Sequence, residues 1–379
     1  MQVARIYDVD ELARLSTTWN RLAGDVPFRR CEWLIPWWRH YGPAISSVQR
    51  QVELFTIGIY DSDQLVGLAP WFIDRSPTRG RVVRFLGSGE VCSDYLTVLA
   101  APGQEEDVAD ALADWLSRAA QTDGADRWDV LALAGVEKND PTLNRLVAQL
   151  YEDRASVYRQ PAASTWRIDL PATWPEYLVR LSKSHRKQIR RLERRVLDTG
   201  DVTLHTATNV AEMREAWRHL TNLHQRRMQS VGQCGCFQSA TFSAFHRDAT
   251  SALFHAGLLR IHWLERAGQA IAAEYHLIGG RTLYVYQGGI DPDLLREEPG
   301  RLATIATLRQ ALAEDFHGFD FCRGDEGYKA HWRATAQDMV DWRIAANRSG
   351  ARLRQGVWAV RRNALGWVRR RLDVSRSDD

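Results

Sequence analysis

The sequence predicts a mixed α/β (α+β) protein in which one kind of α/β unit occurs twice, followed by a basic C-terminal helix. Each half shows a helix, several antiparallel strands, a helix and a further strand. The 379 residues suffice for two or three domains with well-filled cores. The hydrophobic share of 45% and the charged share of 26% are ordinary for a soluble globular protein. Because residue identity between the halves is too low to show repetition directly, the duplication is inferred from the order of elements.

The first predicted domain covers residues 1–155. Its apolar pattern predicts helices and strands in the order 12–22 (helix), 52–60, 65–73, 82–86 and 95–99 (strands), 104–120 (helix) and 129–133 (strand). Residues 28–41 are rich in large aromatic side chains. A break between the halves is predicted at 152–163, which is polar and contains Gln160-Pro161.

The second predicted domain covers residues 164–348. Its predicted elements are 165–170 (strand), 174–198 (helix), 202–206 (strand), 211–229 and 241–255 (helices), and 258–264, 270–278 and 282–288 (strands). Gly279-Gly280-Arg281 separates the last two strands, as expected for a β-hairpin. A helix beginning at Pro299 and a strand at 319–323 complete this half.

The end of that last strand carries an unusual cluster of polar side chains. A short apolar strand leads into a glycine turn, and the turn presents Asp325, Glu326, Tyr328 and Lys329. Charged groups at the end of a buried strand are typical of sites where enzymes place acids, bases and anchoring groups. The alternative interpretation is a polar turn that holds only an ion pair.

The helix start at Pro299-Gly300 is a candidate anion site. The first backbone N–H groups of a helix lack intrahelical partners, and the helix dipole favours an anion by roughly 0.3–1 kcal/mol. Gly300 allows a phosphate to approach the backbone closely, and Arg301 adds positive charge. We therefore predict that Gly300, Arg301, Leu302 and Ala303 bind the phosphates of a cofactor.

Several motifs, in this order and spacing, resemble a known family. They are Phe85-Leu86-Gly87-Ser88-Gly89 with Ser93-Asp94-Tyr95, the basic run 181–191, Gly288-Gly289-Ile290-Asp291, Pro299-Gly300-Arg301-Leu302 and the run 320–329. Together they resemble the GNAT-like acetyltransferases of the cellulose-biosynthesis (CelD/BcsL) type, which are related to the Fem-type aminoacyl transferases of cell-wall assembly. The likeness covers most of residues 15–345.

The resemblance implies two tandem GNAT-like domains, with the acyl-donor site in the second. It also implies an N- or O-acyltransferase that uses acyl-CoA (acetyl-CoA) as co-substrate. The acceptor would be a sugar or amino sugar, free or lipid-linked, in exopolysaccharide or cell-envelope biosynthesis. One departure is visible: the family's Arg/Gln-x-x-Gly-x-Gly/Ala loop corresponds here to Arg296-Glu297-Glu298-Pro299-Gly300-Arg301, with a single glycine.

Acyl transfer needs an anchored thioester, a polarised carbonyl and a base for the acceptor's proton. Glu274 is the first candidate base, because it is a carboxylate inside an otherwise apolar strand. Asp325 is a rival base, and Tyr286 is a candidate proton donor to the leaving thiolate. Lys329 would anchor a phosphate or the acceptor. The structural alternatives are an edge position for Glu274, cross-strand packing for Tyr286 and an ion pair for Lys329.

A basic segment at residues 183–195 is the main candidate for contact with an anionic substrate. We expect Arg186 and Arg190 to contact phosphates of the donor or of a phosphorylated sugar, although a solvated charged face is the usual explanation of such a run. Glu326 and Tyr328 are further candidate substrate contacts, and Asp94 is expected in the cleft between the halves. Nucleic acid is an unlikely partner, except for tRNA if the donor is aminoacyl-tRNA.

Residues 350–379 are predicted to form a basic amphipathic helix and a tail. Such a helix either lies on an anionic membrane surface or packs on its own domain. Apolar runs are too short to span a bilayer, and the odd number of cysteines predicts a cytoplasmic protein, with a peripheral position at the membrane's inner face as the alternative. Cys234-Gly235-Cys236 lacks partners at a ligand spacing, so no metal is predicted. Two further hypotheses are a Fem-type aminoacyl-tRNA-dependent transferase and a non-catalytic GNAT-like module of a polysaccharide synthase complex.

Overall fold

The computed structural model describes residues 1–46 and 50–374, and its side chains up to residue 360 and at Arg362. The first half contains β1 (Gln2–Ile6), α1 (Val9–Arg14), α2 (Ser16–Ala23), α3 (Cys31–Ile45), β2 (Gln51–Leu54), β3 (Thr56–Asp61), β4 (Gln64–Ala69), β5 (Trp71–Ser76), β6 (Gly80–Phe85), β7 (Leu99–Ala100), α4 (Glu105–Gln121), β8 (Val130–Glu137) and α5 (Pro141–Glu152).

The second half begins after the three connecting residues 153–155. It contains β9 (Ser156–Asp169), α6 (Trp174–Arg180), α7 (Lys183–Leu192), β10 (Thr203–Thr206), α8 (Val210–Ser230), α9 (Ala240–His255), β11 (Leu259–Arg266), β12 (Gln269–Gly279), β13 (Thr282–Ile290), α10 (Pro299–Ala313), β14 (Gly318–Arg323), α11 (Tyr328–His331), β15 (Thr335–Ala345) and α12 (Ser349–Val374).

One 11-stranded sheet runs through both halves, in the order β10-β11-β12-β13-β14-β9-β15-β8-β6-β5-β2. A separate sheet in the first half has the order β1-β3-β4-β7. All strand pairs are antiparallel except β13/β14 and β6/β8. The predicted mixed, mostly antiparallel sheet flanked by helices is therefore confirmed.

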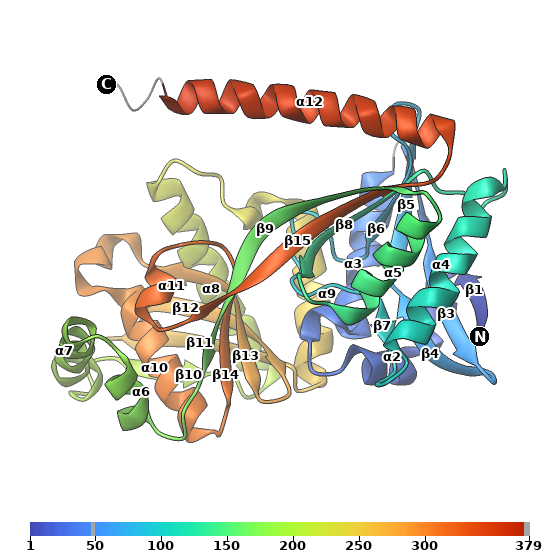
Figure 1. Ribbon diagram of the computed structural model, residues 1–379. Helices are drawn as coiled ribbons and strands as arrows, with labels where there is room; N and C mark the ends of the chain where they lie inside the picture. The colour runs from blue at the N-terminus through green and yellow to red at the C-terminus, as the bar shows by residue number, and fades with distance from the viewer. Residues whose placement is uncertain (47–49, 375–379) are drawn as a thin grey trace.

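The two parallel pairs reveal the repeated unit. In each half a helix leads from one strand to a parallel neighbour: α4 lies between β6 and β8, and α10 lies between β13 and β14. The strand that follows each pair is exchanged between the halves, because β9 pairs with β14 while β15 pairs with β8. The long strands β9 and β15 thus join the two halves side by side (Figure 1).

The predicted break at 152–163 is not a linker in the structure. Most of it belongs to β9, which pairs with β15 from Ser156 to Arg167. The prediction of a linker was wrong because both faces of this strand are partly exposed, so its residues are as polar as those of a linker. The predicted helix 174–198 is also divided: Leu181 has an extended backbone, and the Ser182 side chain accepts a hydrogen bond from the His185 N–H at the start of α7.

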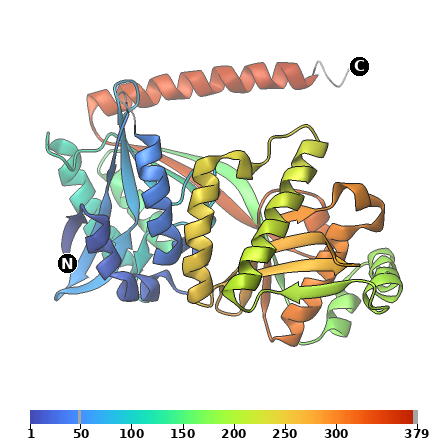
Figure 2. The same cartoon turned by 180° about the vertical axis from the view of Figure 1, so that it is seen from behind.

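The sheet of the second half lies between two layers of helices. Helices α8 and α9 cover one face, and α10 covers the other (Figure 2). A hydrophobic core on the α10 side includes Leu302, Ile305 and Leu308 together with Ile271 of β12. Helix α12 runs along the outside of the molecule and contacts β15 (Figure 1).

Candidate active site

A pocket of about 340 Å³ opens at the start of α10. The elements around it are α7, β12, α10 and α11, so strands and helices far apart in sequence meet there. Its lining residues are His185, Glu274, Gly300, Arg301, Thr304, Tyr328, His331 and Trp332. The structure therefore brings together four predicted site residues, and adds a tryptophan, a threonine and two histidines that the sequence analysis did not single out.

The first turn of α10 presents free backbone donors to this pocket. Pro299 occupies the first helical position, and the intrahelical hydrogen bonds begin with the Leu302 N–H, which donates to the Glu298 carbonyl. The N–H groups of Gly300 and Arg301 precede this first bonded N–H and have no carbonyl acceptor within the helix. None of the described side chains caps this turn. Leu302 and Ala303 are buried in the core and support the turn from behind.

The residue before the helix fixes the entry of the chain. Glu298 has a left-handed backbone (φ +59°), and its carboxylate pairs with the Arg301 guanidinium. Gly300 leaves room above the turn, because a Cβ atom there would meet only Ile290 Cγ2 at 3.5 Å. An anion at the turn would therefore compete with Glu298 for Arg301 without meeting a protein side chain at Gly300.

Glu274 extends from β12 into the same pocket with its side chain 15% exposed. Its Oε2 atom lies 3.1 Å from His276 Nε2 and accepts a hydrogen bond from Thr307 Oγ1 at 3.2 Å. Both contacts use Oε2, so Oε1 has no hydrogen-bond partner among the described residues. A carboxylate held on one oxygen and open on the other suits a general base.

Lys329 lies beside the pocket but points away from it. Its side chain is 2% exposed, and Nζ donates to the carbonyls of Cys322, Arg323 and Gly324 at 2.9–3.3 Å. The same ammonium pairs with Glu326 at 2.9 Å. These contacts hold the turn after β14, and Lys329 does not contribute to the lining of the α10 pocket.

Other predicted site residues also lie outside the pocket. Tyr286 donates its hydroxyl to the Val91 carbonyl at 2.7 Å on the opposite face of the sheet, where burial raises its pKa well above the usual value. Asp325 accepts from the Ser164 N–H and from Trp166 Nε1, both at 3.3 Å. A register shift in the pairing of β12 with β13, between Tyr275 and His276, turns Tyr286 to the face opposite Glu274, where it packs among aromatic rings.

Asp94 takes part in the contact between the halves. It accepts hydrogen bonds from the backbone N–H and the Nε of Arg323, each at 2.8 Å. Burial raises the pKa of Asp94, and the Arg323 charge opposes this shift. Asp94 was expected in a cleft between the halves, and the structure places it in a closed interface there.

The basic helix α7 borders the pocket through His185. Arg186 is partly exposed, while Lys187, Arg190 and Arg191 are exposed to solvent. Burial lowers the pKa of His185, whose Nδ1 lies 2.7 Å from the His331 carbonyl. The positive side chains of α7 thus stand next to the pocket but form no part of its lining.

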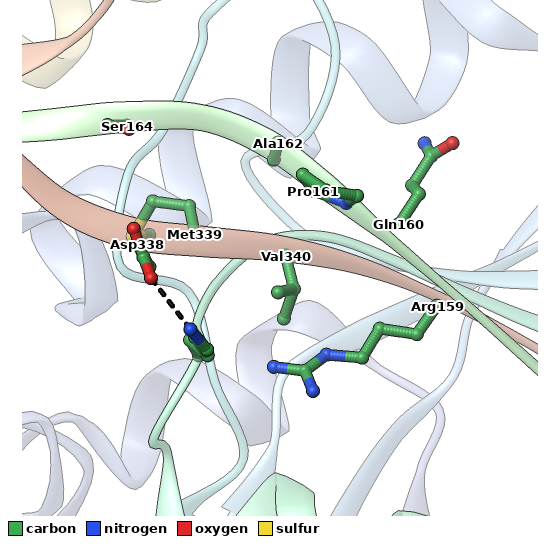
Figure 3. A pocket seen from close by; sticks show the side chains of 9 residues that line it. Arg159, Gln160, Pro161, Ala162, Ser164, Asp338, Met339 and Val340 are labelled. Carbon is green, nitrogen blue, oxygen red and sulfur yellow. Dashed lines mark hydrogen bonds and ion pairs between the residues drawn. The ribbon is translucent and has the colours of Figure 1, made fainter.

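A second cavity of about 460 Å³ lies along the paired strands β9 and β15 that join the halves (Figure 3). Its floor is apolar (Ala162, Met339, Val340), and its rim carries the 2.8 Å ion pair of Lys138 with Asp338. Ser164, at one end of this cavity, hydrogen bonds to Asp325 and to the Gly324 N–H. The turn after β14 therefore lies between the two cavities.

Among the described residues, no group of three or more His, Cys, Asp or Glu side chains is placed to hold a metal ion.

Within the described part of the chain, no helix combines the length and the apolar character needed to cross a bilayer.

Comparison with known proteins finds a family match in the second half. The family model for the "acetyltransferase (GNAT) domain" matches residues 183–330, a range that contains six of the eight residues lining the α10 pocket. This segment is therefore similar to a GNAT acetyltransferase domain. No curated protein sequence matches the chain.

Solved structures share the fold over most of the chain. The crystal structure of FemX has a TM-score of 0.60 at 11% identity and covers 90% of this chain and 97% of its own. A conserved protein of unknown function from Bacteroides thetaiotaomicron has a TM-score of 0.52 at 13% identity, covering 91% of this chain and all of its own. The C-terminal domain of a lysylphosphatidylglycerol synthetase from Agrobacterium fabrum has a TM-score of 0.51 at 10% identity, covering 91% and 95%.

These findings confirm the predicted tandem GNAT-like fold, in which the exchanged strands join two units of the same kind. In sequence, the similarity to a GNAT acetyltransferase domain extends over residues 183–330. The more specific resemblance to the CelD/BcsL type stays a prediction. So do the division into residues 1–155, 164–348 and 350–379 and the roles assigned to individual site residues.

Proposed function

We propose that the protein is a GNAT-type N- or O-acyltransferase that binds acyl-CoA at the start of α10. It passes the acyl group to a sugar or amino-sugar acceptor in exopolysaccharide or cell-envelope biosynthesis. One observation carries the proposal: a single pocket combines the free N–H groups of a helix start with a carboxylate that is open on one oxygen. Anion binding and proton abstraction are the two operations that acyl transfer from a phosphorylated thioester requires.

The donor's phosphates would bind at the N–H groups of Gly300 and Arg301. Because Glu298 pairs with Arg301, phosphate binding would draw the guanidinium from Glu298 toward the ligand. Thr304, one turn later on α10, also lines the pocket and can donate a hydroxyl hydrogen bond. This arrangement would offset the missing second glycine of the family's loop.

The acceptor's nucleophile would lie against Glu274 Oε1. Its nitrogen or oxygen attacks the thioester carbonyl carbon, its proton passes to Oε1, and the C–S bond breaks. The departing thiolate then needs a proton, and Tyr328 is the tyrosine that lines this pocket. Tyr328 thus replaces Tyr286 as the proposed proton donor, because the two lie on opposite sides of the sheet.

The second cavity is the proposed approach for the acceptor. It borders the turn after β14 through Ser164, and Arg159 and Lys138 at its rim can bind hydroxyl or phosphate oxygens of a sugar. Its apolar floor would pack against a sugar ring.

Donor binding can be tested by calorimetry with acetyl-CoA. Gly300→Asp places a carboxylate at the phosphate position, so we expect at least a tenfold loss of affinity. Gly300→Ala is the matched control: its Cβ makes only an ordinary contact with Ile290, so the variant should fold and lose less affinity. If the native protein does not bind acetyl-CoA, or binds it as tightly as Gly300→Asp does, coenzyme A is excluded as the donor.

A second candidate donor is aminoacyl-tRNA. The observation that favours it is the exposed positive surface of α7 beside the pocket, together with the fold shared with FemX. A filter-binding titration with charged tRNA separates the candidates, because binding through α7 should weaken steeply with salt. Binding that does not change with salt, or no binding, excludes this donor.

We also propose that α12 contacts an anionic membrane surface. Leu353, Val357 and Val360 are 71%, 49% and 70% exposed and share one side of the helix. Cosedimentation with vesicles tests this: binding should require anionic lipid and fail for Leu353→Gln with Val360→Gln. Equal sedimentation of that variant would contradict it.

A further inference from the structure

A chain of buried polar side chains extends from Glu274 into the interior of the second half. His276, two residues along β12, lies on the same face of the strand as Glu274, and its side chain is completely buried. His262 of β11 is 2% exposed, and its ring centroid lies 5.2 Å from that of His276. Cores normally fill such positions with apolar groups, so two adjacent imidazoles need a physical explanation.

The far end of the chain reaches the surface at α10. His262 Nδ1 lies 2.9 Å from the Thr206 hydroxyl, and Gln310 Nε2 donates to Thr206 Oγ1 at 3.2 Å. Gln310 Nε2 also donates to Glu314 Oε1 at 2.7 Å. The carboxylate of Glu314 accepts only, so it fixes the orientation of the Gln310 amide.

Two arrangements of the following hydrogen bonds fit this orientation, because Thr206 Oγ1 lies 3.2 Å from Gln310 Nε2 and 3.3 Å from Gln310 Oε1. In the arrangement where Thr206 accepts from Gln310 Nε2 and donates to His262 Nδ1, the proton of the neutral His262 ring sits on Nε2. In the same arrangement, Glu274 Oε2 accepts from His276 Nε2–H and His276 Nδ1 is an acceptor. Burial, together with neighbouring His276 and Arg260, lowers the pKa of His262 well below its usual value, consistent with a neutral ring.

One link is missing between the two imidazoles. Among the described residues, neither His262 Nε2 nor His276 Nδ1 has a hydrogen-bond partner, although both atoms are buried. An unpaired buried polar group costs roughly 1–3 kcal/mol. One of these atoms is a donor and the other an acceptor, so a single water between the rings would satisfy both.

We propose that His276 and His262, joined by one buried water, are positioning residues of Glu274. With Thr206 and Gln310 they form a hydrogen-bond chain whose donors all point toward the carboxylate. These hydrogen bonds hold Glu274 Oε2 and leave Oε1 directed into the pocket. This inference rests on the proposed function only where it names Glu274 as the base.

Imidazole ¹⁵N NMR on the full-length protein tests this series of hydrogen bonds without any substrate. In the native protein, we expect both histidines to be neutral, with the proton on Nε2. Thr206→Val removes the hydroxyl at a partly exposed site that contacts neither Glu274 nor His276. It should release the His262 tautomer and shift the His276 signal. Thr206→Ser keeps the hydroxyl and is the matched control, which should preserve both signals.

A second readout separates positioning from mere packing. In an acyl-transfer assay, Thr206→Val should lower kcat without changing the KM for acetyl-CoA, and Thr206→Ser should change neither, because the substitution loosens the hold on Glu274 and leaves the donor's binding site at α10 intact. A proton on His276 Nδ1 in the native protein, or unchanged ¹⁵N signals in Thr206→Val, would overturn the inference. Failure of acetyl-CoA binding would instead overturn the proposed donor and leave the NMR result standing.

Discussion

Among single residues, Asp320 on β14 carries a buried carboxyl group. It is 1% exposed, accepts a 2.5 Å hydrogen bond from the Tyr95 hydroxyl of the first half, and accepts another from the Cys322 N–H at 2.7 Å. Burial raises its pKa to about 7, while both hydrogen bonds oppose the shift. The folded state therefore holds this proton at a pH where the unfolded chain has released it.

We expect Asp320 to lower the stability of the protein as pH rises from about 4 to about 7, because only the unfolded chain loses the proton in that window. At about 1.4 kcal/mol per pH unit, the loss amounts to up to about 4 kcal/mol. Asp320→Asn should flatten this slope in urea unfolding experiments at several pH values. Asp169→Asn, whose carboxylate is 88% exposed, should leave the slope unchanged. An Asp320→Asn slope equal to the native one would contradict the expectation.

Among the secondary-structure elements, α8 and β13 pack so closely that residue 289 has no room for a side chain. A Cβ atom at Gly289 would lie 2.5 Å from the backbone nitrogen of His224 and 2.9 Å from the carbonyl of Leu220. At the neighbouring Gly288, a Cβ atom would meet nothing closer than the Ala273 carbonyl at 3.7 Å. Close packing against α8 therefore requires glycine at position 289 but not at position 288.

Gly289→Ala should destabilise the protein by about 1–3 kcal/mol, because the helix backbone must move away from the sheet. Gly288→Ala should change the free energy of unfolding by less than about 0.5 kcal/mol. Chemical denaturation of both variants checks this pair. Equal stabilities would show that α8 shifts without cost and that the close packing is not limiting.

At the scale of the whole molecule, the halves are joined by exchanged strands and by ion pairs of unequal burial. Arg323 and Asp94 meet at 2.8 Å with side chains 31% and 2% exposed. Lys138 and Asp338 also meet at 2.8 Å, but their side chains are 49% and 67% exposed. The shortest N···O distance is the same in the two pairs, so their energies should differ through burial and through the further hydrogen bonds of Arg323 to Asp94 and Ser93.

Arg323→Gln should lower the free energy of unfolding by about 3 kcal/mol or more, since it leaves the Asp94 carboxylate buried without its partner. Lys138→Gln should change it by less than about 1 kcal/mol. Because one sheet runs through both halves, each variant should still unfold in one cooperative step when followed by two spectroscopic probes. Two separate transitions in the native protein would contradict this picture of a single folding unit.

The sequence analysis singled out some of the residues that line the α10 pocket but not all of them. Gly300 and Arg301 were predicted from the helix start and Glu274 from its isolation in an apolar strand, and all three line one pocket. His276 carried a readable signal, because a residue two positions from Glu274 shares its face of the strand. His185 and Trp332 carried none, since their approach to α10 depends on the packing of α6, α7 and α11.

The sequence by itself determined the local structure: apolar periodicity and glycine turns set most strands and helices, and Pro299-Gly300 set the start of α10. These signals are local because hydrogen bonds of helices and hairpins join residues close in sequence. Only the tertiary structure decided which strands pair across the halves and whether a polar side chain faces a pocket or the core. Lys329 illustrates the reason: its charge is explicit in the sequence, but its three carbonyl partners exist only once β14 turns back upon it.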